Sequence, residues 1–102
     1  VQTCALPIFG VIKVHLQVPG SRSLKEKRHA IRSLKDQLQS RFKVSVAEVD
    51  DQDMHQSCVI GVAFVASDGK NAQSRLQNLV NFIEDYRNAV VVAIDKEILH
   101  ED

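Results

Sequence analysis

Hydrophobic and polar residues alternate near the start of this chain, and the pattern then changes to a longer period. In the segment Phe9–Val18 the alternation follows Gly10: from Ile12 to Val18 apolar residues recur at every second position, with Val14 on one side and Lys13 on the other. Strict alternation is typical of a strand that buries one face. We therefore predict a half-buried strand over residues 9–18, which Pro19-Gly20 ends.

The next segment has the spacing of an amphipathic helix. Its apolar residues lie seven, three and four positions apart, at Leu24, Ile31, Leu34 and Leu38. Ser23 precedes Glu26 by three residues, which is the spacing of a capping box with Ser23 at the N-cap. The pattern predicts a helix that ends near Phe42.

Three further strands and a second helix complete the predicted elements. Val44–Asp50 and Cys58–Ala66 are expected to be strands, the second of them apolar throughout. Ser67-Asp68-Gly69 supplies capping residues for a helix, whose apolar stripe is Leu76, Leu79, Val80, Ile83 and Tyr86. The last strand is expected over Ala89–Ile94, and Asp95–Asp102 is expected to be a charged tail.

This order of elements predicts an α+β fold. Two strand–helix–strand halves with right-handed crossovers form a ferredoxin-like βαββαβ sandwich, a four-stranded antiparallel sheet with two helices on one face. We expect residues 9–102 to form this single domain. Residues 1–8 read like the translation of a DNA-sequencing adapter, so we expect a non-native or disordered segment there. A native flexible arm is the alternative.

The composition excludes several classes of protein. The 102 residues are 44% hydrophobic and 25% charged, which is the ordinary globular mixture and excludes disorder or a disulfide scaffold. No apolar run reaches the roughly 18–20 residues of a membrane span, so no membrane partner is expected. Cys58 lies in an apolar run and is expected to be an inert core residue. We expect no disulfide, and this suits the reducing environment of the cytoplasm.

Charge is distributed unevenly although the chain is neutral overall. Residues 1–43 hold nine Lys and Arg residues against two acids, whereas residues 44–102 hold four against eleven. A strongly basic half suggests an anionic partner for one surface. The alternative is that the two halves interleave in the fold and their charges mix.

The basic residues of the first predicted helix are its best candidate site. Lys25, Arg28, Arg32 and Lys35 follow one another at spacings of three, four and three, so they share one helical face. Such a face, at a helix start that favours anions, can bind phosphates without reading bases. We predict a nucleic-acid contact, to RNA or ribosomal particles, through Arg22, Lys25, Arg28, His29, Arg32 and Lys35. A solvated helix face is the alternative.

Two predicted strands are apolar on both faces. Cys58–Val65 and Val90–Ile94 do not alternate, although two helices cover only one face of the sheet. We therefore expect a homodimer, or another partner, on the open face. The alternative is that Gly61, Ala63 and Ala93 are small enough to leave that face only mildly apolar.

Other chemistry finds little support in the sequence. Asp50, Asp51, Asp53 and His55 cluster in one predicted turn, but their spacing matches no calcium loop. A solvated turn is favoured over a metal site, and contact with the basic helix of a neighbouring subunit is a second option. No nucleophile elbow, phosphate loop or dinucleotide fingerprint occurs. We expect no enzyme activity, no cofactor and no small-molecule substrate.

Three segments resemble a known family of small bacterial proteins. Residues 18–29, 31–36 and 44–53, which include Ser23-Leu24-Lys25-Glu26-Lys27-Arg28 and Val46-Ala47-Glu48-Val49-Asp50, resemble the YlxP-like family, a domain of unknown function. The resemblance implies a ferredoxin-like fold, a cytoplasmic protein, and genes near those for translation initiation and ribosome maturation. The family has no established activity, so no catalytic residues are carried over. Family members often have an aromatic residue where this chain has His55.

Overall fold

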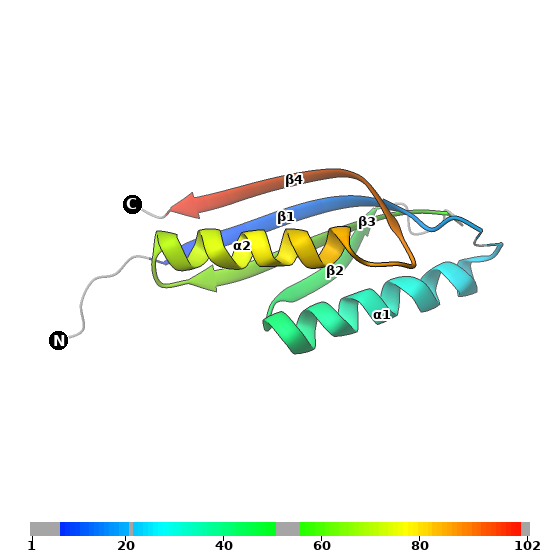
Figure 1. The fold of residues 1–102 in the computed structure, drawn as a ribbon, viewed down its shortest axis with the longest axis horizontal. Helices are drawn as coiled ribbons and strands as arrows, with labels where there is room; N and C mark the ends of the chain where they lie inside the picture. Colours follow the sequence, from blue (N-terminus) through cyan, green and yellow to red (C-terminus); the bar gives the residue numbers. More distant parts are fainter. Residues whose placement is uncertain (1–6, 21, 51–55, 101–102) are drawn as a thin grey trace.

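The fold consists of four strands and two helices in the predicted order. The computed structural model describes residues 7–20, 22–50 and 56–100. Its elements are β1 (Ile8–Gln17), α1 (Leu24–Phe42), β2 (Ser45–Asp50), β3 (Ser57–Ala66), α2 (Gly69–Glu84) and β4 (Val90–His100). Figure 1 shows both helices on the same side of the sheet. Neither described helix combines the length and the apolar character that a membrane crossing requires.

The sheet has the strand order β2-β3-β1-β4, and all neighbouring strands are antiparallel. This arrangement is that of a ferredoxin-like α+β sandwich, as the sequence predicts. The alternation in β1 is also confirmed, because Val14 is buried whereas Lys13 is exposed on the other face. The core between sheet and helices contains Val14, Ile60, Leu34 and Leu79.

The start of α1 has the predicted cap. The Ser23 hydroxyl accepts a hydrogen bond from the backbone N–H of Glu26 at 3.2 Å. The Glu26 carboxylate in turn accepts one from the backbone N–H of Arg22 at 2.9 Å. The first bond satisfies a backbone donor that the helix start leaves without a partner, and the second ties the residue before the cap to the first turn, so together they fix where α1 begins.

The predicted charged tail after Ile94 is wrong. β4 continues to His100, which lies opposite Ile8 of β1, so the sequence Asp95-Lys96-Glu97 is part of the strand. Ile94 and Ile98 are half-buried against the core, four residues apart on the helix side. Pairing with β1 satisfies backbone groups along the whole segment, and this outweighs the low strand propensity of the three charged residues.

The second helix ends earlier than its apolar stripe suggests. Of the predicted capping residues Ser67-Asp68-Gly69, Asp68 is the N-cap, and its carboxylate accepts a hydrogen bond from the backbone N–H of Asn71 at 2.7 Å. The helix ends at Glu84, so Tyr86 lies in the connection to β4 and not on the helical stripe. The Tyr86 hydroxyl donates to the backbone carbonyl of Ala30 at 2.9 Å, which ties this connection to α1.

Two segments with sequence predictions lie partly outside the described residues. Of residues 1–8, which we expect to be non-native or disordered, residues 1–6 lie outside the described residues. Ile8, the last residue of that segment, is the first residue of β1. The acidic turn is described only at Asp50, since residues 51–55 lie outside.

Candidate nucleic-acid interface

The helix α1 carries five of the six predicted contact residues. Lys25, Arg28, His29 and Arg32 are exposed, and Lys35 is half-buried. The sixth, Arg22, precedes the helix and is also exposed.

Two neighbouring hollows bring these side chains together. Lys25, Arg28, His29 and Arg32 line the first, with Glu26. The second has a volume of about 200 Å³ and is lined by Arg28, Arg32 and Lys35, with Ile31 and Glu48. Arg28 and Arg32 belong to both hollows, so the five residues of α1 form one continuous surface, whereas Arg22 lines neither hollow. We call these five residues the basic surface.

Arg28, Arg32 and Lys35 of the basic surface form no ion pair with acids from the described part of the second half of the chain. Within residues 7–20, 22–50 and 56–100, no carboxylate oxygen lies within 4.0 Å of the charged group of Arg28, Arg32 or Lys35. Acids of the second half therefore form no direct ion pair with these three residues in the described part of the chain, although Glu48 lines the second hollow beside them.

A buried lysine lies directly beneath the basic surface. The side chain of Lys27 is 0% exposed, and its Nζ lies 3.2 Å from Oε2 of Glu48. The same Nζ donates to the backbone carbonyl of Ser57 at 3.1 Å. The Cys58 thiol also donates to Glu48 Oε2, at 3.3 Å. A buried ammonium requires a counter-charge and acceptors, and Glu48 on β2 and Ser57 on β3 supply them.

Sequence reasoning missed this pair, although the pattern contained a signal for it. The apolar stripe of α1 skips from Leu24 to Ile31, and a helix whose stripe is continuous needs an inward position between them. Lys27 occupies that inward position. The gap indicates that one of residues 27 and 28 faces the sheet, and a charged residue there needs a partner such as Glu48.

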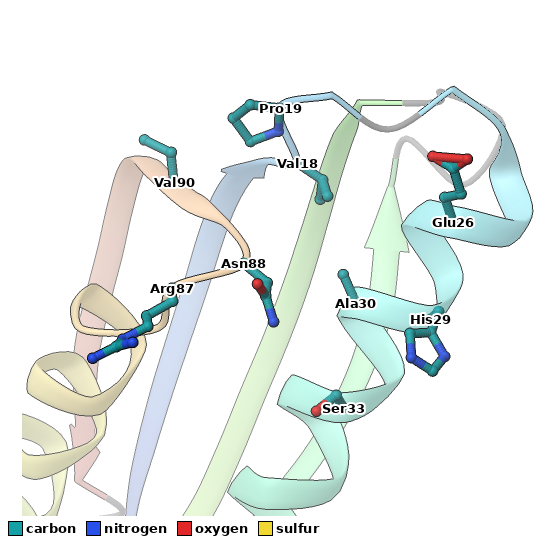
Figure 2. Close-up of a pocket in the computed structure, with 9 residues that line it drawn as sticks. All are labelled: Val18, Pro19, Glu26, His29, Ala30, Ser33, Arg87, Asn88 and Val90. Atoms are coloured by element: carbon teal, nitrogen blue, oxygen red, sulfur yellow. The ribbon is translucent and has the colours of Figure 1, made fainter.

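A further pocket opens beside the basic surface. It has a volume of about 500 Å³ and lies between the first half of α1 and the connection from α2 to β4 (Figure 2). Val18, Pro19, Ala30 and Val90 supply apolar lining, and Glu26, His29, Ser33, Arg87 and Asn88 supply polar groups. Figure 2 shows Asn88 and Ser33 extending into the space between the two elements, whereas Arg87 points away from α1. Glu26 and His29 also line the first basic hollow, so the two sites adjoin.

The open face of the sheet is apolar in part. Residues that pair across strands share a face, so Phe9, Val65 and Leu99 form one row of this face. The next row contains Val11 and Ala63 together with the exposed acid Glu97. The large hydrophobic residues that are exposed among the described residues all lie on strands: Val11, Val49, Val65, Val90, Val92 and Leu99.

The described residues contain no group of three or more His, Cys, Asp or Glu side chains arranged to hold a metal ion. Of the acidic turn considered from the sequence, Asp51, Asp53 and His55 lie outside the described residues.

Comparison with known proteins identifies the family of the chain. It is similar to the "Uncharacterized protein YlxP" of Bacillus subtilis (strain 168), with 34% identity over 64 residues, which are 63% of this chain and 70% of that protein. The fold is similar to that of the solved "De novo designed protein Foldit4", with a TM-score of 0.58 at 11% identity over 94% of this chain and 99% of that one. The sequence profile of the family described as "Protein of unknown function (DUF503)" matches residues 9–96, and the chain therefore belongs to the DUF503 family.

Proposed function

We propose that this protein is a non-enzymatic RNA-binding protein of the cytoplasm that contacts ribosomal RNA or ribosomal particles through the basic surface of α1. The observation that carries the proposal is the clustering of Lys25, Arg28, His29, Arg32 and Lys35 along two adjoining hollows. No carboxylate oxygen of the described residues lies within 4.0 Å of the charged nitrogen atoms of these Lys and Arg residues. Cations held close together at a surface attract phosphates, because phosphate charge is neutralised as bound counterions are released.

The binding expected from this surface follows the backbone of the RNA. Arg28 and Arg32 carry planar guanidinium groups that can bind a phosphate through two hydrogen bonds each. Lys25 and Lys35 extend the charge along the helix. Phosphate contacts position a protein on a nucleic acid but carry no sequence information. We therefore expect affinity for RNA with little preference among sequences.

Recognition of bases by stacking on the sheet is not expected. Proteins that bind RNA on an open sheet stack bases on exposed aromatic side chains. Here Phe64 is buried on the helix side of β3, where the Arg75 guanidinium lies 4.5 Å from its ring centre. Phe9 is the aromatic residue that the described strands place on the open face, and it is half-buried.

The proposal is tested by titrating a fluorescein-labelled single-stranded RNA with the purified protein between about 50 and 200 mM salt, a range over which phosphate contacts weaken measurably. We expect affinity to fall as salt rises, and Arg28→Gln with Arg32→Gln to reduce both affinity and its salt dependence. The matched control is Lys70→Gln with Lys96→Gln, which removes two exposed cations elsewhere. Affinity that is independent of salt, or equal losses in both double variants, would defeat the proposal.

The open sheet face supports a second and separable proposal, that the protein forms a homodimer. A second copy of the chain can bind this face because Lys13 and Asp95 lie opposite each other on it. Each copy then offers a cation and an acid that can pair with the acid and the cation of the other. The chain also has zero net charge, so two copies do not repel each other overall. The apolar row with Phe9, Val65 and Leu99 supplies the surface to be buried.

A further inference from the structure

The carboxylate of Glu48 faces two groups of cations. On its buried side Oε2 is paired with Lys27 Nζ at 3.2 Å. On its outer side, where 18% of its side chain is exposed, Glu48 lines the same hollow as Arg28 and Arg32. Glu48 is therefore an acid that can compete with a phosphate for these two guanidinium groups in the second hollow.

We propose that Lys27 is a positioning residue for RNA binding: its buried ammonium holds the Glu48 carboxylate and so keeps Arg28 and Arg32 available for phosphate. This inference rests on the proposed function, since it concerns the same basic surface. It assigns a role in binding to a side chain that has no exposed surface and cannot touch the ligand.

The charges around the hollow explain why Lys27 matters. Arg28, Arg32 and Lys35 contribute three positive charges, and Glu48 subtracts one. A guanidinium group binds a carboxylate and a phosphate with the same bidentate geometry, so an uncompensated Glu48 is a direct competitor of the ligand. The Lys27 ammonium offsets the negative charge of Glu48. Opposite charges 3.2 Å apart in a partly buried site interact more strongly than they do in water.

The position of the Glu48 carboxylate is fixed by further contacts. Oε2 accepts from the Cys58 thiol at 3.3 Å, and Lys27 is itself held by the Ser57 carbonyl at 3.1 Å. Both contacts come from β3, so the carboxylate is drawn toward the sheet and away from the outer residues of α1. Loss of the Lys27 charge removes the ion pair that draws the carboxylate inward, and Glu48 can then pair with Arg28 or Arg32 in the same hollow.

The test compares four proteins in the RNA titration: wild type, Lys27→Met, Glu48→Gln, and the double variant. We expect Lys27→Met to weaken binding about tenfold, the effect of losing one charge-assisted contact. The slope of log affinity against log salt should become shallower by about 0.7, since one phosphate contact to a single strand is lost. The double variant should bind like wild type, because the competing carboxylate is absent. Glu48→Gln alone should bind more tightly than wild type.

The outcomes separate this inference from the proposed function. If wild type does not bind RNA with a salt dependence, the proposed function fails. If wild type binds and Lys27→Met binds equally well, the proposed function stands and this inference is overturned. If Lys27→Met loses binding and the double variant does not regain it, Lys27 has only a structural role and the inference is again overturned.

Folding of each variant is checked by circular dichroism and thermal unfolding. Should Lys27→Met fail to fold, the decision falls to Glu48→Gln, which retains the lysine. Tighter binding by Glu48→Gln supports the competition between Glu48 and phosphate, and unchanged binding contradicts it.

Discussion

The ring of Phe64 occupies the space that a side chain at Gly10 would need. Three atoms of the ring lie within 3.0 Å of the position of a β-carbon on residue 10. The two residues lie opposite each other on β3 and β1. The ring cannot move freely, because Arg75 lies over it at 4.5 Å and donates to the backbone carbonyl of Val65 at 2.8 Å.

Gly10→Ala is therefore expected to destabilise the protein. Overpacking of a filled core costs about 1–3 kcal/mol, and we expect the upper part of that range because Arg75 holds Phe64 in place. The midpoint of thermal unfolding should fall by about 10 °C. The matched control is Gly69→Ala at the first position of α2, where an added β-carbon meets nothing within 4 Å. Equal midpoints for the two variants would contradict the expected overpacking.

A second prediction concerns the residue that follows α1. Lys43 has a φ of 57°, in the left-handed region, and its backbone N–H donates to the carbonyl of Gln39 at 3.1 Å. Glycine adopts this conformation without the penalty of a β-carbon. Lys43→Gly should thus be about 1 kcal/mol more stable than Lys43→Ala, as measured by urea denaturation. Both variants lack the lysine charge, so their difference isolates the backbone effect, and equal stability would refute it.

The Lys27–Glu48 pair leads to a third prediction, on stability and not on binding. Lys27→Met leaves the Glu48 carboxylate, 18% exposed, without its lysine partner. Removal of one partner of a buried pair costs about 3–5 kcal/mol, and we expect about 2–3 because Glu48 retains some contact with water. Lys27→Met with Glu48→Leu should recover most of the loss, since apolar replacements of a buried pair are often neutral. Additive effects in this double-mutant cycle would show that the two charges do not interact.

The fourth prediction concerns the open sheet face. Wild-type protein is expected to sediment as a dimer in analytical ultracentrifugation, and Val65→Asp as a monomer, because a carboxylate placed in the buried row loses its hydration. Val65 is 58% exposed in the single chain, so the substitution should leave the fold intact. Asn78→Asp on the exposed side of α2 adds the same charge and serves as the control. A monomeric wild type would end the homodimer proposal.

The sequence patterns predict those parts of the fold in which local preference and burial agree. The alternation of Val14 and Lys13 and the Ser23–Glu26 cap each depend on residues close in the chain, and both are confirmed. The end of β4 could not be predicted in this way. Asp95-Lys96-Glu97 has no local preference for a strand, and it becomes one only because β1 lies beside it.

In the candidate site, too, the features that depend on nearby residues could be predicted, and those that depend on distant residues could not. The spacing of Lys25, Arg28 and Arg32 on one helical face follows from the sequence, because a helix fixes which of its residues are neighbours. The burial of Lys27 does not, since it depends on Glu48 and Ser57, which lie far along the chain on other elements. Sequence reasoning placed the cations but could not identify which of them faces inward.

The place of β1 in the sheet has a consequence for how the chain folds. β1 is the first strand in the sequence, yet it lies between β3 and β4 and pairs with both. Residue 8 meets residue 100, so the β1–β4 pairing joins parts of the chain that are far apart. Contacts of such long range slow folding, because the chain entropy is lost before the contacts form. Neither half of the polypeptide can complete a sheet by itself, and refolding should therefore be a single cooperative step that requires the whole domain.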